Sequence, residues 1–257
     1  MKKLIALLLA IVMVACLFTG CGKKNASDFE TVAEDGKVIV GITDFAPMDY
    51  KDDNGEWTGF DAELARQVFG KLDLEVEFIE IDWDNKILEL DGGSIDCVWN
   101  GMTLSDEVLK GMQCTDPYVV NAQVIVTTPE NNLGDAVEDY ADLAYAVEAG
   151  SAGESSAKNN GYANVTAVST QANALMEVAS GSADACIIDL TMANAMTGEG
   201  TSYANLTKVL ELDREEYGIG FRKGSDLCTK VNEILKEMKA DGSMQALADE
   251  YELTVCE

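Results

Sequence analysis

The sequence predicts an α/β fold made of two similar lobes. Strand-like and helix-like segments alternate along the 257-residue chain, a pattern typical of sheets that carry helices on both faces. Two segments also match each other: residues 85–96 read NKILELDGGSID, and residues 173–184 read NALMEVASGSAD. Each copy has helical apolar spacing, then Gly-Ser, and each is followed by an apolar run typical of a buried strand. We therefore expect one helix–strand unit of this kind in each lobe.

The elements of the first lobe follow this alternation. Residues 60–72 place their apolar side chains on one helical face. Asn54-Gly55 favours a hairpin turn, because these residue types readily adopt positive φ angles. In chain order we expect strand 37–43, a hairpin at 52–55, helix 60–72, strand 74–81, the helix of the first repeat copy and strand 97–99.

The second lobe is predicted between two crossings of the chain. Residues 123–128 (QVIVTT) indicate a strand that leaves the first lobe, and residues 217–221 (YGIGF) indicate a strand that returns. Lobe 1 then comprises residues 37–123 and 217–257, and lobe 2 comprises residues 124–216, with a hinge and a cleft between them. The remaining expected elements are strand 143–148, helix 152–160, strand 164–168, helix 171–180, strand 184–189 and helices 225–239 and 243–251.

The N-terminal residues resemble a bacterial lipoprotein signal. A positively charged start precedes an apolar run of about 15 residues, shorter than the roughly 20 that span a membrane. The run ends in small residues before Cys21, so we expect removal of residues 1–20, lipidation of Cys21 and a polar tether at 21–36. Cleavage before Cys16 is a weaker alternative, because it would truncate the apolar run. These features predict a protein anchored by lipid to the outer face of the cell membrane.

The composition excludes several classes of function. The 18 basic and 46 acidic residues give a net charge of −28, which opposes binding to nucleic acid or anionic membrane surfaces. The chain has no histidine, which excludes Ser-His and Cys-His catalytic systems. Because no C-x-x-C motif is present, no zinc site is expected, and we predict no metal or cofactor. Asp52, Asn54 and Glu56 faintly resemble a calcium loop, but Tyr50 occupies its first ligand position, which favours a plain hairpin.

Five cysteines follow Cys21, and an odd number cannot all pair. Cys97 and Cys186 lie in predicted buried strands, where a thiol packs as a small apolar group. Cys228 with Cys256 is the one disulfide that we would test, because it would tie the C-terminal residues to the last long helix.

An ordered set of motifs runs through the chain. Residues 59–65 read GFDAELA, directly after the hairpin, and are followed by DWDNKILELDGGSIDCVWNGMTLSDE, TDPYVV, QVIVTT and YGIGFRKGSD. As a set, over roughly residues 37–252, these motifs resemble the extracellular solute-binding proteins of family 3, the polar amino-acid receptors of ABC importers. The resemblance implies a periplasmic-binding-protein-like (type II) fold with two hinge crossings. It also implies a monomeric, non-enzymatic receptor that delivers its ligand to an ABC permease in the membrane.

The resemblance implies ligand contacts by three large or charged side chains. Phe45 matches an aromatic residue that stacks on the ligand, and Trp83 stands where a second cleft aromatic is frequent. Either ring can instead belong to the core. Asp189 matches the acid that binds the α-ammonium group of an amino acid, and the alternative is a buried structural acid.

Two further segments complete the expected site. Asn100, Gly101 and Thr103 match a segment that offers backbone and hydroxyl groups to an amino acid. Ser151 and Ala152 open a predicted helix, whose free N–H groups suit a carboxylate.

One position departs from the family pattern. The family places an arginine five residues after the position of Thr103, where it holds the α-carboxylate, and this chain has Val108 there. Three alternatives follow. The helix at Ser151 holds the carboxylate alone, Lys86 or Arg214 substitutes for the arginine, or the ligand is not an ordinary α-amino acid.

Our main hypothesis is a lipid-anchored receptor that captures a small polar ligand, an amino acid or a derivative, by closure of its lobes. The first rival is an enzyme on the same fold, because some similar proteins act as cyclohexadienyl dehydratases. Such an enzyme needs a carboxylic acid in the cleft, and Asp189 is the candidate. The second rival is a sensor module that reports its ligand to a partner without transport.

Overall fold

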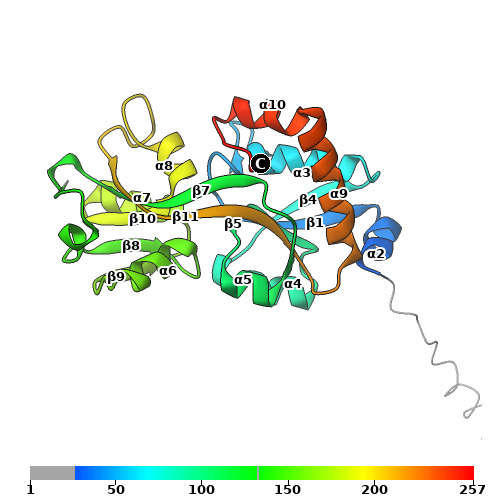
Figure 1. Cartoon of the computed structure of the whole chain (residues 1–257), viewed down its shortest axis with the longest axis horizontal. Coiled ribbons are helices and arrows are strands. Elements are labelled where there is room, and N and C mark those ends of the chain that lie inside the picture. Colours follow the sequence, from blue (N-terminus) through cyan, green and yellow to red (C-terminus); the bar gives the residue numbers. More distant parts are fainter. Residues whose placement is uncertain (1–26, 132) are drawn as a thin grey trace, which may run out of the picture.

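The computed structural model describes residues 27–131 and 133–257, and it confirms the predicted two-lobed α/β architecture. Two long strands, β7 (Val119–Thr127) and β11 (Thr207–Phe221), run side by side between the lobes (Figure 1). The chain leaves lobe 1 in β7 and returns in β11, so the proposed lobe boundaries fall inside these two strands. The predicted signal peptide and Cys21 lie outside the described residues.

One mixed sheet of nine strands runs through the described parts of both lobes. Its order is β4 (Glu75–Glu80), β1 (Lys37–Ile42), β5 (Cys97–Thr103), β11, β7, β10 (Ala185–Asp189), β8 (Tyr145–Glu148) and β9 (Val165–Val168), with β6 (Gln113–Cys114) paired to β11. Strands β4, β1 and β5 are parallel, as are β9, β8 and β10. The sequence predicted parallel sheets. The crossing strands differ because they pair antiparallel with each other and with β5 and β10.

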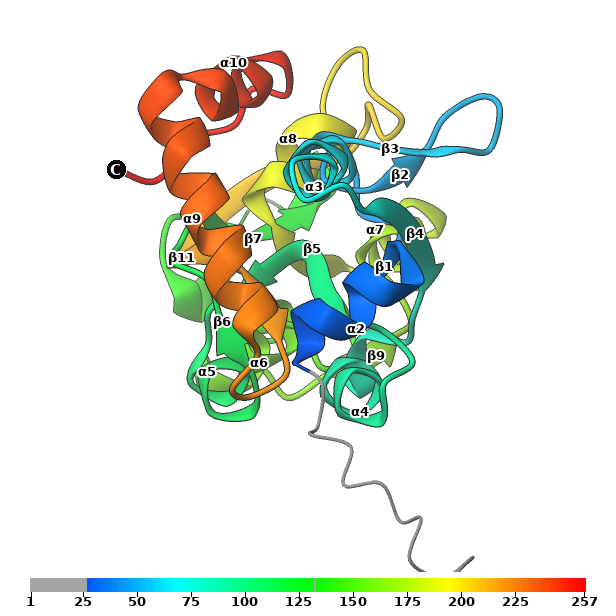
Figure 2. The ribbon, with the colours of Figure 1, turned by 90° about the vertical axis from the view of Figure 1, so that its right-hand side faces the viewer.

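Helices cover both faces of this sheet. Lobe 1 contains α2 (Asp28–Asp35), α3 (Phe60–Gly70), α4 (Lys86–Gly92), α5 (Asp106–Gly111), α9 (Asp226–Asp241) and α10 (Ser243–Glu250), and lobe 2 contains α6 (Ala152–Asn159), α7 (Gln171–Ser180) and α8 (Leu190–Met196). Figures 1 and 2 show α3, α8 and α10 on one face of the sheet and α4, α5 and α6 on the other. Within residues 27–131 and 133–257, no helix combines the length and apolarity needed to span a bilayer.

The internal repeat is confirmed in detail. Its two copies form α4 and α7, and each helix ends at a glycine with a φ of 78°, Gly93 and Gly181. The following residue donates its N–H to a carbonyl five residues back, the bond of a Schellman motif. Asp96 accepts the N–H of Ile39 at 2.9 Å, and Asp184 accepts that of Ala144 at 2.9 Å. Each copy therefore ends a helix and fixes the neighbouring parallel strand in the same way.

The predicted hairpin is present, and the predicted tether is partly wrong. Strands β2 (Tyr50–Lys51) and β3 (Trp57–Thr58) pair across a turn in which Asp52 accepts two backbone N–H groups. Within the segment predicted as a polar tether, residues 28–35 form α2, capped by Ser27 and Glu30 in a capping box. Asp28 forms an ion pair with Arg222 at 3.1 Å, so this helix is fixed to lobe 1.

The described cysteines are all free thiols, so the Cys228–Cys256 bridge is not formed. The two thiols have different neighbours. The pKa of Cys228 is raised by burial and by the charge of Cys114, whereas the pKa of Cys256 is raised by burial and by Glu216.

Candidate ligand-binding site

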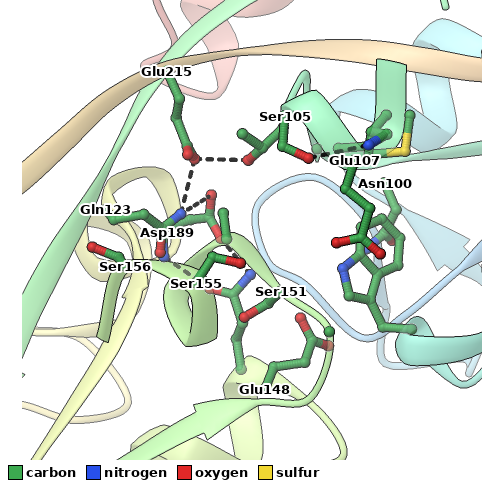
Figure 3. Close-up of a pocket in the computed structure, with 18 of the residues that line it drawn as sticks. Asn100, Ser105, Glu107, Gln123, Glu148, Ser151, Ser155, Ser156, Asp189 and Glu215 are labelled. Atoms are coloured by element: carbon green, nitrogen blue, oxygen red, sulfur yellow. Dashed lines mark hydrogen bonds between the residues drawn. The ribbon is translucent and has the colours of Figure 1, made fainter. Parts of the chain in front are cut away.

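A cavity of about 180 Å³ lies between the lobes, against the crossing strands (Figure 3). This volume is more than ten times the roughly 10–15 Å³ that a cavity needs to hold one water molecule, so the cavity has room for a small organic molecule. All the ligand contacts predicted from the sequence line it: Phe45, Trp83, Asn100, Gly101, Thr103, Ser151, Ala152 and Asp189.

Strand ends explain this convergence. Thr103 is the last residue of β5, Asp189 the last of β10, and Glu148 the last of β8. In open α/β sheets, ligands bind beyond the carboxyl ends of the strands. Because β5 and β10 are the strands of the two repeat copies, the duplication brings two equivalent strand ends to one cavity. Helix α6 follows the end of β8 and begins at Ala152.

The polar groups of Asn100 and Gly101 are already engaged within the protein. The Asn100 side chain accepts the N–H of Thr43 and donates to its hydroxyl, both at 2.8 Å. The Gly101 N–H donates to Asp61 Oδ2 at 2.6 Å. These bonds hold the loop after β1 and the helix start of α3 against β5, so both residues shape the cavity wall.

Asp61 has a larger role than the sequence predicted. The GFDAELA motif indicated only an acid in the first helical turn, but the side chain is fully buried and also accepts the Tyr118 hydroxyl at 2.8 Å. Burial raises the pKa of Asp61 to about 7, although the hydrogen bonds from Tyr118 and Gly101 oppose the shift. Asp61 therefore anchors the strand that lines the cavity.

Gly101 allows Phe45 to reach the cavity. Its φ is +54°, and a Cβ atom at this position would lie 2.5 Å from Phe45 Cε1. The Phe45 ring in turn packs edge-on against Tyr217, with centroids 6.4 Å apart. Phe45 is buried, so it combines the two roles that the sequence left open: it belongs to the core and contributes one edge to the cavity.

Asp189 lies at the centre of a buried hydrogen-bond network. Tyr217 donates its hydroxyl to Oδ1 at 2.7 Å, and Gln123 donates its amide to the same atom at 3.1 Å. Asn121 also donates to Oδ1, and Gln171 donates to Oδ2. Burial raises the pKa of Asp189 well above its usual range, and the nearby charge of Glu215 adds to the effect. Asp189 thus organises the cavity wall as well as lining it.

Glu215, on β11, is a cavity residue that the sequence analysis missed. Its Oε1 accepts hydrogen bonds from Thr103 at 2.9 Å, Asn121 at 2.7 Å and Gln123 at 2.8 Å, and Figure 3 shows the bond to Gln123. The two amides donate to both Glu215 and Asp189, and so connect the two carboxylates. One signal was available in the sequence: Asn121 and Gln123 are polar residues at alternate positions of an apolar strand, where an unexplained polar side chain marks a site.

The position of the expected arginine is apolar. Val108, on α5, is buried and lines the cavity. None of the three arginines lines it: Arg222 binds Asp28 and Asp96, Arg66 donates to a backbone carbonyl, and Arg214 pairs with Glu211 on the surface. The suggestion that Arg214 replaces the family arginine is therefore wrong.

Lys86 does reach the cavity, but its ammonium group is occupied. Its Nζ donates to the carbonyl of Trp83 at 3.1 Å and to that of Gly150 at 2.9 Å. It also lies 4.8 Å from the centre of the Trp83 ring. Since Trp83 and Lys86 belong to lobe 1 and Gly150 to lobe 2, Lys86 connects the lobes.

The first turn of α6 is surrounded by acidic side chains. Ser151 accepts the N–H of Glu154 at 3.1 Å, and Glu154 Oε2 accepts that of Gly150 at 2.8 Å. Glu148 is 3 % exposed, and burial raises its pKa to about 8, although the charge of Lys86 opposes the shift. Within residues 27–131 and 133–257, no cluster of three or more acidic or cysteine side chains is positioned to hold a metal ion.

Known proteins of similar sequence and structure bind amino acids. The chain is 28 % identical over 247 residues to the L-cystine-binding protein TcyJ of Escherichia coli (strain K12), covering 93 % of this chain and 92 % of the relative. An ancestral arginine-binding protein bound to arginine superposes with a TM-score of 0.78 at 34 % identity, covering 84 % and 98 % of the two chains. The ancestral amino acid-binding protein AncCDT-1, a precursor of cyclohexadienyl dehydratase, gives a TM-score of 0.80 at 33 % identity, covering 88 % and 99 %.

The family assignment rests on nearly the whole described fold. The model of the bacterial extracellular solute-binding proteins, family 3, matches residues 38–254, from β1 to the residues after α10. This range includes both lobes, both crossing strands and every residue that lines the cavity. The chain belongs to the bacterial extracellular solute-binding proteins, family 3.

Proposed function

We propose that this protein is the lipid-anchored substrate-binding component of an ABC importer, and that it captures an amino acid or a derivative by closing its lobes. The named ligands of its relatives, L-cystine and arginine, support an amino-acid-like ligand. The ATP-hydrolysing and membrane-spanning parts of the importer would be separate subunits, with the closed form docking on the permease.

The observation that carries this proposal is the position of the cavity. Its lining comes from both lobes and from both crossing strands, so a ligand held there contacts parts that move relative to one another when the hinge bends. A ligand shifts the open–closed equilibrium only by its greater affinity for the closed form, and about 5.5 kcal/mol shifts a 1:99 ratio to 99:1. A cavity shared by two lobes supplies that difference, because one lobe alone offers half of the contacts.

A ligand screen tests the proposed function. Melting temperatures and calorimetric affinities would be measured with the common amino acids, cystine, and the amines derived from amino acids. We expect at least one to raise the melting temperature and to bind with one-to-one stoichiometry. If none of these compounds binds or stabilises the protein, capture of an amino-acid-like ligand is contradicted.

The lipid anchor is tested separately, in bacterial cells that express the full chain. A Cys21→Ser variant should be found in the medium, because no lipid is attached. A Cys16→Ser variant should stay in the membrane fraction and serves as the matched control. Release of the Cys16 variant instead would move the lipidation site to the alternative position.

A dehydratase activity is the second candidate. Two observations favour it: the similarity to AncCDT-1, a dehydratase precursor, and the buried acid Glu148, whose raised pKa of about 8 suits a proton donor at neutral pH. The excess of carboxylates in the cavity disfavours it, because prephenate and arogenate themselves carry carboxylates. Incubation with each compound, followed by absorbance of an aromatic product, separates the enzyme from the receptor.

A further inference from the structure

The cavity is lined by more acidic than basic side chains. Among residues 27–131 and 133–257, one ammonium group lines it, that of Lys86, and this group is engaged by two backbone carbonyls. The acidic side chains that line it are Glu107, Glu148, Asp189, Asp213 and Glu215. Glu148 and Asp189 are buried, where opposite charge is screened least by solvent. Burial raises the pKa of both groups, and a cation bound beside them would favour their ionised forms, so the cavity suits a cation better than an anion.

Two buried acceptors of the cavity have no hydrogen-bond donor. Among the described residues, none donates to Oε1 of Glu148 or to Oε1 of Gln123, and these side chains are only 3 % and 1 % exposed. Both residues line the cavity. Buried acceptors without a donor are destabilising, and the effect is larger for a carboxylate. A ligand that donates hydrogen bonds would satisfy both atoms.

The described cavity offers little to a ligand carboxylate. Val108 takes the place where a cation was expected, and none of the three arginines lines the cavity. The first turn of α6 remains as a candidate, but Glu154 already binds the Gly150 N–H, and Glu148 precedes that turn. A ligand carboxylate at α6 would therefore lie among carboxylates of the protein itself, an arrangement that like-charge repulsion opposes.

Asp189 and Glu148, the buried acids of the cavity, lie in separate parts of it, whereas Glu107 and Asp213 are exposed. Figure 3 shows Asp189 and Glu215 together on one side, connected by Gln123, and Glu148 on another side near Ser151. One positive group bound at Asp189 and Glu215 would leave the unpartnered Oε1 of Glu148 unsatisfied. A second positive group would complete the site.

We propose that the cavity selects a small ligand with two cationic nitrogen groups, one facing Asp189 and Glu215 and one facing Glu148, and that it requires no α-carboxylate. This inference rests on the proposed capture of a small ligand and specifies its chemistry. The expected ligands are therefore diamines and decarboxylated basic amino acids, and zwitterionic amino acids are expected to bind more weakly.

Matched ligand pairs test this inference by calorimetry on the purified protein. Lysine is compared with cadaverine and arginine with agmatine, since each pair differs only in the α-carboxylate. Glutamine is the neutral amino acid, and pentylamine is the amine with one charge. We expect cadaverine and agmatine to bind at least as tightly as lysine and arginine, and at least about 100-fold tighter than glutamine or pentylamine.

Three other results of this comparison would contradict either the dication inference alone or the proposed receptor function as well. If glutamine or cystine binds more tightly than the diamines, the proposed receptor function stands and the dication inference is overturned. If lysine binds about 100-fold tighter than cadaverine, the carboxylate is recognised and the inference is likewise overturned. If no compound of either charge type binds, both the inference and the proposed function fail.

A pair of charge-matched variants locates the second cation. Glu148→Gln keeps the shape of the side chain and removes its charge, and we expect about a tenfold or greater loss of cadaverine affinity with little change for pentylamine. Glu138→Gln removes one charge from an exposed position of the same lobe outside the cavity, and should leave both affinities unchanged. Equal effects of the two variants would show that Glu148 acts only through long-range attraction between the acidic protein and a cation. That result would overturn the assignment of Glu148 to the second cationic group.

Discussion

Asp189 and Glu148, two buried acids of the cavity, differ in how many hydrogen bonds they accept from the protein. Four side chains donate to Asp189, whereas Oε1 of Glu148 has no donor among the described residues. A carboxylate has about four lone-pair sites, so Asp189 uses most of its capacity to hold the cavity wall. Oε1 of Glu148 can still accept a hydrogen bond from a ligand. The two residues therefore differ in how their replacement should affect stability and binding.

Replacement of Asp189 by Asn should reduce affinity for any aminated ligand by about 100-fold, because the side chain can no longer ionise beside a cation while its size is kept. Calorimetry measures the affinity, and the melting temperature serves as a check on folding. Asp189→Ala should be less stable than Asp189→Asn, because it leaves Tyr217 and Gln171 without their acceptor. Unchanged affinity in a folded Asp189→Asn variant would show that this carboxylate is purely structural.

Glu148 should make stability depend on pH. Burial raises its pKa from 4.5 to about 8, so the folded protein keeps a proton that the unfolded chain loses across this window. The free energy of unfolding therefore falls as the pH rises from 4.5 to about 8, and this contribution levels off above that pH. The surrounding charges are those of Lys86, which stabilises the ionised form, and Asp82, which opposes it.

Glu148→Gln should remove this contribution. We expect its melting temperature to exceed that of the parent by about 5 °C at pH 9 and to match it at pH 4. Melting curves across the pH range provide the measurement. An identical pH dependence of parent and variant would mean that Glu148 titrates normally.

The residues found from the sequence share one property, since each matches a position at which the family contacts its ligand. Glu215, Glu148 and Gln123 were not assigned such a contact, although Gln123 opens the QVIVTT motif. Glu215 is in a charged stretch of β11, DREE, where nothing in the sequence distinguishes an acid facing the cavity from one facing solvent. Which acid lines the cavity depends on the register of β11 against β7, and that register shifts between Glu211 and Arg214.

At the scale of elements, the two repeat copies act as equivalent units. Asp96, just before β5, accepts the N–H of Ile39 in β1, and Asp184, just before β10, accepts that of Ala144, the residue before β8. Asp96 is further bound by Arg222. Asp184 has no such arginine. Its hydrogen bond to Ala144 is therefore the simpler test of what the motif contributes.

Asp184→Ala should lower the free energy of unfolding by about 1.5 kcal/mol, the lower end of the range for a hydrogen bond to a charged group, because Asp184 is exposed. Urea denaturation measures the change. Asp91→Ala, on an exposed position of α4, is the matched control and should have no effect. Equal effects of the two substitutions would show that the Asp of the repeat does not stabilise the strand.

Helix α5 offers an element-scale test of ligand chemistry. It presents Val108 to the cavity, and Ser105 caps its start by accepting the Val108 N–H at 3.2 Å. Val108→Arg should place a guanidinium near the cavity and favour ligands with a carboxylate. We expect the ratio of lysine to cadaverine affinity to rise about tenfold, as measured by calorimetry. A ratio that stays unchanged in a folded variant would mean that the position of Val108 does not contact a ligand carboxylate.

The long elements were predictable from the sequence, and the short or charged ones were not. Helices α3, α7 and α9 have clear apolar faces, and the strand runs 37–43 and 184–189 are apolar between their terminal residues. Helices α5 and α8 have only 6 and 7 residues, too short for a periodic signal. The first ten residues of β11 escaped notice because charged residues fill them and only the pairing with β7 makes them a strand.

At the scale of the whole molecule, the fold brings the cavity and the hinge together. The strands that cross between the lobes are β7 and β11, and the same strands supply Gln123 and Glu215 to the cavity. Lys86 of lobe 1 binds the carbonyl of Gly150 in lobe 2 at 2.9 Å. The lobes thus already contact each other beside the cavity, as a closed form requires. Closure over a ligand would exclude water from the acidic groups and strengthen their attraction for a cation.

Small-angle X-ray scattering tests lobe closure most directly. The radius of gyration would be measured for ligand-free protein and for protein saturated with the tightest ligand of the calorimetric screen. We predict a smaller radius in the saturated protein, because a ligand that contacts both lobes favours the closed form. Binding detected by calorimetry with no change in the radius of gyration would contradict closure of the lobes on the ligand.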